Sequence, residues 1–335
     1  MSTAPAPSPP LGYLPWQQAW HRALFAHDGF YRRDAPASHF RTAAHAAPTE
    51  LAHALAALAV AHHCRRIIDL GAGRGELLRA VHTVAPGLAL HAVDVVGRPV
   101  DLPAAVGWST GLAELPDELW DGALVVAWEL LDTVPCPVLE RDDDAVLRQV
   151  LVSPTGEERL GDPATEAELQ WCRRWWPGPA SRVEVGLERD ELWAHLVTRA
   201  DHHRAGRRSV GDRTVLLAVD YAHRCDSRPP TGSLAAYRDG RQVTPAPDGS
   251  CDITAHVAID AVAAAGEAAG AHTLELTTQR EALRTLGVQA RPRPGRALTA
   301  ADLARLNREG ELIDPGGLGG FSWLLQVVTR SDPTG

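Results

Sequence analysis

The chain has 335 residues, of which 45% are hydrophobic and 22% are charged, a composition typical of globular proteins. Its length suits either one enlarged α/β domain or a core with a smaller companion, and no apolar run is long enough to predict a membrane helix. The formal net charge of -9 disfavours broad attraction to nucleic acid. The five scattered cysteines, with no CxxC pair, disfavour a disulfide framework and a zinc cluster.

The amino-terminal residues 1–12 are rich in Pro and Ala and have no basic region followed by an apolar one, so they do not resemble a secretory signal. We predict a disordered Pro-rich tail there and a soluble, cytoplasmic protein with reduced thiols. Arg-rich segments at 199–213 and 291–296 are the candidates for a nucleic-acid surface, but neither is interleaved with aromatic residues. Both are expected to be solvated surface.

A βαβ unit is predicted next in the chain. Residues 49–63 have helical spacing, 65–70 form a short apolar strand that ends in glycines, 76–85 carry one apolar helical face, and 88–96 form a second strand. Further strands are predicted at 105–109, 121–127, 214–221, 272–276 and 322–328, with helices at 189–205, 257–269 and 300–307. This alternation predicts a Rossmann-like α/β fold with a seven-stranded sheet.

Two stretches do not fit the alternation. Residues 136–186 contain a predicted hairpin, a Pro/Gly-rich break and a Trp-rich helix, and residues 222–252 are a long Gly/Pro/Arg-rich loop. We interpret both as cap elements over the carboxyl ends of the strands, where ligands bind in open α/β sheets. Trp171, Trp175 and Trp176 share a helical face, which is predicted to pack the insert against the core, with a substrate-facing aromatic wall as the alternative.

The strongest motif is IIDLGAGRGELL at 67–78. Gly71, Gly73 and Gly75 let the backbone turn tightly after the strand and approach a ligand closely. A dinucleotide-binding fingerprint would need its third glycine at position 76, where this chain has Glu76, so a dehydrogenase is disfavoured. The alternative is that the glycines form only a tight structural connection.

Two acidic residues accompany the glycines. Asp69 suits the ammonium of a methionyl group, and Asp94, at the end of the second strand, can accept both ribose hydroxyls of an adenosine. Together they indicate an adenosine cofactor, and we predict S-adenosyl-L-methionine, with S-adenosyl-L-homocysteine as its product. The cofactor site predicted around this motif comprises Asp69, Gly71, Ala72, Gly73, Gly75, Asp94 and Val95.

Candidate catalytic residues follow the fourth and fifth strands. Glu129 and Asp132, in WELLDTVP, are placed to hold or deprotonate a nucleophile, with a capping role for Glu129 and a solvated Asp132 as the alternative. Asp220 and Tyr221 could line the substrate pocket, and capping explains Asp220 equally well. The adjacent histidine pairs at 62–63 and 202–203 diverge on their helices, so no metal site is predicted.

These motifs, in this order, resemble the MidA family of S-adenosylmethionine-dependent methyltransferases, which includes mitochondrial complex I assembly factors that methylate a protein arginine. The likeness lies in DGFYRRDAPASHFRTAAHAAPTELA (28–52), the glycine motif, WELLDTVP, RVEVG, VDYAHR, GSLAAYRDGRQV, DITAHV, TQREALRTLGV and GGLGGFSWLLQ. It implies a seven-stranded methyltransferase sheet with a helical and hairpin insert, and an amino-terminal segment, with Phe30, Tyr31 and Phe40 to Thr42, that folds over the cofactor. Trp128 and Ala222 depart from the family's Asn and Gly.

We therefore predict, after the Pro-rich tail at 1–12, a segment over the cofactor at 13–48, a methyltransferase domain at 49–135 and 188–330 with a long loop insert at 222–252, and a cap at 136–187. Tyr31, Trp128 and Tyr221 are the predicted substrate contacts. The leading hypothesis is methylation of an arginine of a partner protein. The alternatives are a small-molecule methyltransferase, favoured by Trp128 and the aromatic insert, and a cofactor-binding assembly protein without catalysis. Nucleic acid and membrane are not expected partners, and a homodimer is left open.

Overall fold

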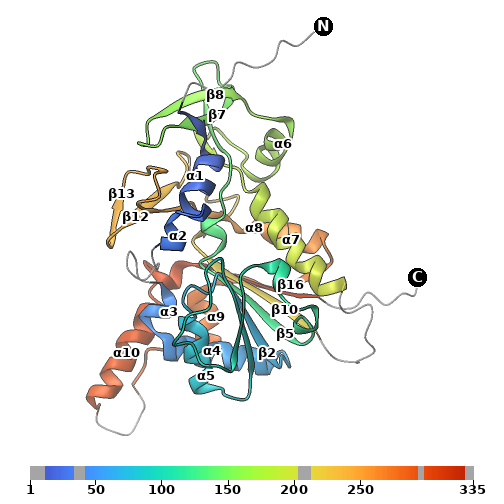
Figure 1. Ribbon diagram of the computed structural model, residues 1–335, viewed down its shortest axis with the longest axis vertical. Coiled ribbons are helices and arrows are strands. Elements are labelled where there is room, and N and C mark those ends of the chain that lie inside the picture. The colour runs from blue at the N-terminus through green and yellow to red at the C-terminus, as the bar shows by residue number, and fades with distance from the viewer. Residues whose placement is uncertain (1–11, 34–41, 203–212, 293–297, 329–335) are drawn as a thin grey trace, which may run out of the picture. The chain divides into compact units, whose positions relative to one another are not determined.

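The structure is a computed structural model in which residues 12–33, 42–202, 213–292 and 298–328 are described (Figure 1). The chain divides into two compact units: unit 1 comprises residues 1–40, 132–191 and 223–261, and unit 2 comprises residues 41–131, 192–222 and 262–335. Phe40, nearly all of the predicted tail and most of both Arg-rich segments lie outside the described residues. No helix in the described ranges has both the length and the apolar character that a membrane crossing requires.

Unit 2 is built on a seven-stranded sheet with the strand order β16-β17-β10-β5-β2-β3-β4. Strands β10, β5, β2, β3 and β4 are parallel, and β17 is antiparallel to both β10 and β16. The strands are β2 (Arg66–Leu70), β3 (Ala89–Val93), β4 (Val106–Ser109), β5 (Ala123–Trp128), β10 (Thr214–Asp220), β16 (Ala271–Thr278) and β17 (Ser322–Val328). The predicted seven-stranded α/β fold is confirmed.

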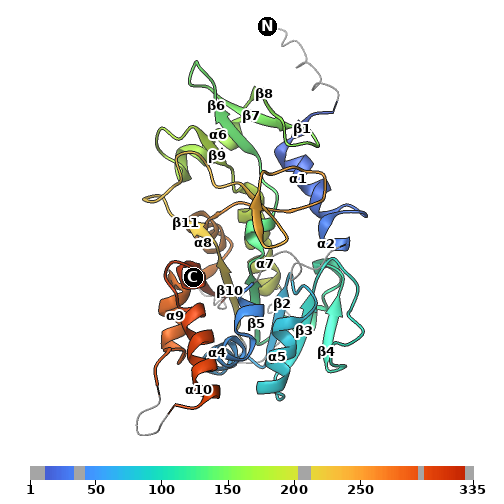
Figure 2. The ribbon, with the colours of Figure 1, turned by 90° about the vertical axis from the view of Figure 1, so that its left-hand side faces the viewer.

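The central strands of this sheet are covered on both faces. Every residue of β5 (ALVVAW) and of β10 (TVLLAVD) is buried, as expected for parallel strands that read as continuous apolar runs. In α5, Leu77, Leu78 and Val81 are buried in the same core as the apolar face of α4, and the two helices pack side by side (Figure 2). The helices of unit 2 are α3 (Ala43–Ala46), α4 (Pro48–Ala61), α5 (Glu76–Val84), α9 (Gln279–Thr285) and α10 (Ala300–Leu312), with 3-10 turns η2 (Leu112–Glu114), η3 (Asp117–Leu119) and η5 (Leu318–Gly320).

Unit 1 contains two small antiparallel sheets. The larger has the order β1-β7-β6-β9, with β8 also paired to β7, and the smaller has the order β13-β12-β14. Their strands are β1 (Leu14–Pro15), β6 (Val138–Arg141), β7 (Leu147–Val152), β8 (Glu158–Pro163), β9 (Arg182–Glu184), β12 (Ala235–Arg238), β13 (Arg241–Val243) and β14 (Asp252–Thr254), and its helices are α1 (Trp16–Phe25), α2 (Phe30–Arg33) and α6 (Glu166–Trp175). The predicted hairpin and Trp-rich helix correspond to β6–β7 and α6.

The Trp-rich helix begins at a capping box: Thr165 Oγ1 accepts the N–H of Glu168 at 3.3 Å, and Glu168 Oε2 accepts the N–H of Thr165 at 2.6 Å. Trp171 and Trp176 are buried together with Leu139 and Val183 in a core of unit 1, with their ring centroids 6.4 Å apart. Trp176 follows the end of the helix instead of belonging to it. These tryptophans thus pack inside the unit that carries them.

Several predicted elements need correction. Residues 222–252 are not a structureless loop, because they contain β11 (Ala222–His223), β12 and β13. The predicted helix at 257–269 begins with a short strand, β15 (Val257–Ala258), which pairs with β11, and only then becomes α8 (Ile259–Ala268). The helix predicted at 189–205 is α7 (Leu187–His202). The chain passes from one unit to the other within η4 (Leu131–Thr133), α7, β11 and α8.

Candidate functional site

The glycine turn after β2 adopts a backbone that only glycine takes easily. Gly71, Gly73 and Gly75 have φ angles of +71, +60 and +78°, in the left-handed region. A Cβ atom would lie 2.8 Å from Leu130 Cδ1 at Gly71, and 2.6 Å from Leu102 Cδ1 at Gly75. The turn leads directly into α5, with Gly75 as its N-cap. The backbone of the glycine turn, which has no side chain at these three positions, therefore lies at the amino end of α5, where polar and anionic ligand groups bind.

The carboxylate of Asp94 is fixed against this turn. Its Oδ2 accepts the N–H of Gly73 at 2.8 Å, and its Oδ1 accepts the N–H of Val96 at 3.2 Å. Burial raises the pKa of Asp94, and the backbone N–H groups of Gly73, Val96 and Val95 counteract part of that rise. Because each carboxylate oxygen has a second lone pair, both remain able to accept a hydroxyl of a ligand.

Asp69, the fourth residue of β2, is 3% exposed. Burial, reinforced by the nearby carboxylates of Asp94 and Glu76, raises its pKa to about 8. No hydrogen-bond donor among the described residues reaches its carboxyl group. A buried acid without a partner is costly, and a ligand ammonium is the kind of group that would satisfy it.

A chain of polar contacts joins Thr42 to the start of α5. Thr42 Oγ1 lies 2.6 Å from His45 Nδ1, and His45 Nε2 lies 3.5 Å from Glu76 Oε1. The other oxygen of Glu76 accepts the N–H of Arg74 at 2.9 Å. Glu76, which occupies the position of the third glycine in a dinucleotide fingerprint, therefore helps to hold the turn in shape.

The two carboxylates of unit 2 that were predicted to be catalytic both hold backbone N–H groups. Glu129 has a φ of +52°; its N–H donates to Val219 O at 2.8 Å, and its Oε1 accepts the N–H of Ala43 at 2.9 Å. Asp220 is fully buried, and its Oδ2 accepts the N–H of Leu131 at 2.9 Å. Both carboxylates thus stabilise the backbone that they contact. The same hydrogen bonds fix the two carboxylates at neighbouring strand ends.

One edge of the sheet therefore collects four carboxyl groups. Strands β10, β5, β2 and β3 are adjacent and parallel, so their carboxyl ends lie at the same edge. Asp220 is the last residue of β10 and Asp69 the last but one of β2, while Asp94 and Glu129 directly follow β3 and β5. The glycine turn lies at the same edge, after β2.

Aromatic side chains also lie at these strand ends. Trp128 is buried and packs edge-to-face on Trp323 of β17, with ring centroids 5.7 Å apart. Tyr221, which follows β10, is 38% exposed, and its ring lies 4.0 Å from that of Phe321. The predicted substrate contacts Trp128 and Tyr221 thus belong to aromatic pairs of unit 2.

Tyr31 and Asp132, the other predicted substrate and catalytic residues, belong to unit 1. The Tyr31 hydroxyl donates to Asp252 Oδ1 at 2.7 Å, and the backbone carbonyl of Asp132 accepts the N–H of Ala255 at 3.0 Å. The sequence reasoning assigned no role to Asp252, although it is the first residue of the DITAHV segment. Its pairing with Tyr31 depends on tertiary structure, so the sequence carries no signal for it.

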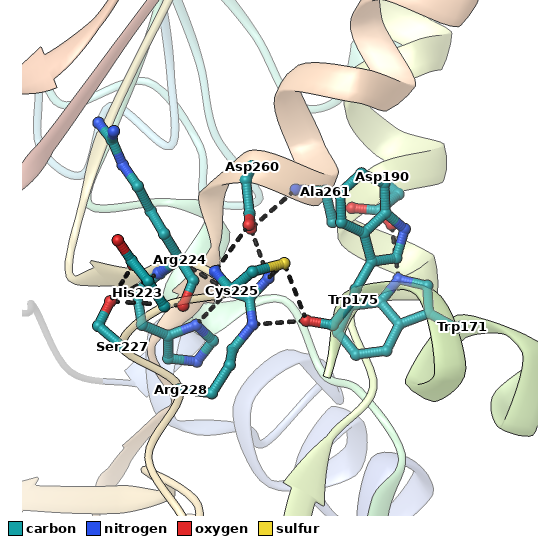
Figure 3. Close-up of polar contacts among 11 residues, drawn as sticks. Trp171, Trp175, Asp190, His223, Arg224, Cys225, Ser227, Arg228, Asp260 and Ala261 are labelled. Atoms are coloured by element: carbon teal, nitrogen blue, oxygen red, sulfur yellow. Dashed lines mark hydrogen bonds and ion pairs between the residues drawn. The ribbon is translucent and has the colours of Figure 1, made fainter. Parts of the chain in front are cut away.

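A second polar network of unit 1 lies beside the Trp-rich helix (Figure 3). Arg228 forms an ion pair with Asp260 at 2.5 Å and donates from Nε to the carbonyl of Trp175 at 2.7 Å. Its Nη1 lies 2.7 Å from His223 Nδ1. Burial, followed by the charge of Arg228, lowers the pKa of His223 to about 3, so this imidazole is neutral at ordinary pH. The network fixes residues 223–228 to α6 and α8.

Asp190 completes this region (Figure 3). Its Oδ2 accepts the indole N–H of Trp171 at 2.7 Å. Burial raises the pKa of Asp190 to about 7, although the Trp171 bond lowers it in part. The contact fixes the Trp171 ring in the core of unit 1.

Comparison with known proteins gives one family and several solved structures. Residues 89–277 match a family described as "Putative S-adenosyl-L-methionine-dependent methyltransferase". A protein from Burkholderia thailandensis, crystallised with bound S-adenosyl-homocysteine, is 24% identical with a TM-score of 0.72, and the match covers 96% of this chain and 89% of that chain. The native structure of an uncharacterized protein from the same organism is 24% identical with a TM-score of 0.71 and the same coverage. These structures share the fold. No curated protein matches the sequence.

Proposed function

Because the chain belongs to the family of S-adenosyl-L-methionine-dependent methyltransferases, we propose that it methylates an arginine side chain of a partner protein, the activity implied by its resemblance to the MidA family. S-adenosyl-L-methionine is its cofactor, and S-adenosyl-L-homocysteine is the product. The observation that carries the choice of a cationic acceptor is the pair of carboxyl groups, Glu129 and Asp220, at neighbouring strand ends on the sheet edge that carries the glycine turn.

The residues around the glycine turn fit the cofactor. We assign the backbone at Gly71, Ala72, Gly73 and Gly75 to close approach of the ligand, because a Cβ atom at the first or last glycine would overlap a leucine. Asp69, a buried carboxyl that no donor of the described residues reaches, would receive the ligand's ammonium. Asp94, with Val95 beside it, would accept the ribose hydroxyls. Thr42, joined through His45 to Glu76, completes the assignment.

S-adenosyl-L-methionine supplies an electrophilic methyl group on a sulfonium. The protein must hold the acceptor nitrogen in line with that methyl and exclude water. An arginine acceptor is cationic at ordinary pH, so a carboxylate must orient the guanidinium and take up the proton that it loses. Glu129 is our candidate because its backbone and its Oε1 are both fixed. Asp220 positions the same turn through Leu131.

A small-molecule acceptor is the second candidate function. The observation that favours it is the aromatic group at the same strand ends, in which Tyr221 lies against Phe321 and Trp128 against Trp323. Such surfaces bind planar apolar molecules. The departure of Trp128 from the family's Asn points in the same direction.

Incubation of the protein with methyl-labelled cofactor and host lysate separates the candidates. Label in acid-precipitated protein that is released as methylarginine on hydrolysis supports the proposal, whereas label in the small-molecule fraction supports the second candidate. Bound cofactor product with no transfer at all would indicate a non-catalytic binding protein. Glu129→Gln is expected to lower turnover at least about a hundredfold while it retains cofactor affinity. Glu118→Gln, at an exposed position of unit 2, is the matched control.

A further inference from the structure

Asp252 of unit 1 is a carboxyl group with one oxygen occupied and one unsatisfied. It is fully buried, and its Oδ1 accepts the Tyr31 hydroxyl at 2.7 Å. Within the described part of the chain, no donor reaches its Oδ2. Burying a carboxylate oxygen without a partner costs free energy that folding alone does not recover. The unsatisfied oxygen therefore points to a donor outside the described residues.

Three further groups share the space around Asp252. Tyr237 is its cross-strand partner in the antiparallel pair β12–β14, and such partners project on the same face. Asp132 is 4% exposed. The charges of Asp132 and Asp252 both raise the pKa values of the Tyr31 and Tyr237 phenols, together with burial, which is the larger cause. The two carboxyl groups and the two aromatic rings thus lie close together.

The buried cation Arg189 lies in the same unit. Arg189 donates from Nε to the carbonyl of Val134, from Nη1 to that of His256 and from Nη2 to that of Asp132, at 3.2, 3.0 and 3.0 Å. Its donors are thus directed to backbone carbonyls, and they hold the main chain of Asp132 in place. Burial, the largest cause, and the charge of Asp132 raise the pKa of Asp252 to about 8, against the opposing bond from Tyr31.

We infer that Tyr31, Asp132, Tyr237 and Asp252 form a binding site in unit 1 for an organic cation of the guanidinium class. A guanidinium offers several N–H donors in one plane, which suits the unsatisfied carboxylate oxygen, and its faces stack on tyrosine rings. This cation site does not depend on the proposed function.

The test uses the full-length protein and N-acetyl-L-arginine N-methylamide as the probe, with the matching citrulline derivative as a neutral isostere. Calorimetry is expected to show binding of the arginine probe and none of the citrulline derivative. Asp252→Asn should weaken the probe at least about tenfold, the loss of a charged hydrogen bond, and Tyr31→Phe should weaken it less. Asp239→Asn, an exposed position in the turn of the same sheet, should bind as the wild type does. Equal affinities for the arginine and citrulline probes would overturn the inference. Wild-type affinity of Asp252→Asn for the arginine probe would do the same.

A second measurement needs no variant. In wild-type protein with ¹³C-labelled aspartate carboxyls, saturation with the arginine probe is expected to lower the pKa of Asp252, because a cation then faces it together with Tyr31, Asp132 and Tyr237. If Asp252 and Asp132 only share a proton and bind no cation, the probe will leave the pKa of Asp252 unchanged. That result would refute the site. If the probe binds but the lysate experiment labels no protein, the proposed function fails while the cation site stands. If the lysate experiment yields labelled methylarginine but the probe does not bind, the cation site is refuted and the proposed function stands.

Discussion

Replacement of Asp69 by asparagine is expected to stabilise the cofactor-free protein and to weaken cofactor binding at the same time. Asp69 is 3% exposed, and the described residues give its carboxyl group no hydrogen-bond donor. Folding therefore transfers an acid out of water without compensation. Asparagine has nearly the same shape and no charge, so it removes that cost while it also removes the carboxylate that we propose binds the ligand's ammonium.

The magnitude follows from the pKa of Asp69, which rises from 3.8 to about 8 in the folded protein. Because the folded-state pKa is the higher one, the contribution of this group to stability is fully present below pH 3.8 and is lost as the pH rises toward 8. A pKa shift of one unit corresponds to about 1.36 kcal/mol, so at pH 7 the folded protein is about 4 kcal/mol less stable than it would be if Asp69 kept its ordinary pKa. Between pH 6 and pH 8, it should lose about 2 kcal/mol relative to Asp69→Asn.

Urea unfolding of the wild type and of Asp69→Asn at pH 6, 7 and 8 measures this difference directly. Asp201→Asn, at an exposed position of unit 2, controls for the lost charge and should show the pH dependence of the wild type. The affinity of Asp69→Asn for S-adenosyl-L-homocysteine should fall at least about tenfold. A variant whose stability follows that of the wild type at every pH, or whose affinity is unchanged, would refute the reasoning.

Three further substitutions test the packing. Gly75→Ala should weaken binding of the cofactor product at least about tenfold and lower the free energy of unfolding by about 1–3 kcal/mol. The reason is that the φ of Gly75 is +78° and a Cβ would lie 2.6 Å from Leu102 Cδ1. A variant that binds the product with wild-type affinity in calorimetry would contradict this. Gly266→Ala should destabilise by about 1–3 kcal/mol without change in affinity, since a Cβ would overlap Gln326 Oε1, and an unshifted urea midpoint would exclude that overlap. Thr165→Ala should cost about 1 kcal/mol through loss of the N-cap bond to Glu168, and Thr165→Ser should restore it if capping is the cause.

The sheet of unit 2 could be predicted because its signals are local. Continuous apolar runs at 123–128 and 214–220 identify strands that are covered on both faces, and the range 322–328 was predicted as the structure has it. The start of α8 could not be predicted in this way. Residues 257–258 pair with β11, which lies far away in sequence, and their apolar character suits a strand and a helix equally.

The β12–β13 hairpin was missed although a signal was present. Asp239 and Gly240 have φ angles of +52 and +73°, as in the two-residue turns that favour Asp-Gly in hairpins. The Gly, Pro and Arg residues around them obscured the alternation that would have identified the flanking strands. A search for Asp-Gly between short alternating runs would have found it.

In the candidate site, too, contacts that are local in sequence could be predicted and long-range contacts could not. Gly71, Gly73 and Asp94 lie within one βαβ unit, so a local pattern was enough to assign them to one cofactor site, and in the structure Asp94 Oδ2 accepts the N–H of Gly73. Asp252 and Tyr31 are separated by 221 positions, and no local pattern relates them. Their contact depends on how α2 and β14 pack within unit 1, which only the folded chain reveals.

The most direct test of the central claim is calorimetric titration of the wild type and of Asp94→Asn with S-adenosyl-L-homocysteine. Asparagine keeps an oxygen for the N–H of Gly73, which Asp94 binds at 2.8 Å, but it loses the charge that we propose binds the ribose hydroxyls. The account predicts one site per wild-type chain and a loss of at least about tenfold in affinity in the variant. Absence of heat with folded wild-type protein, or equal affinities of the two proteins, would contradict it.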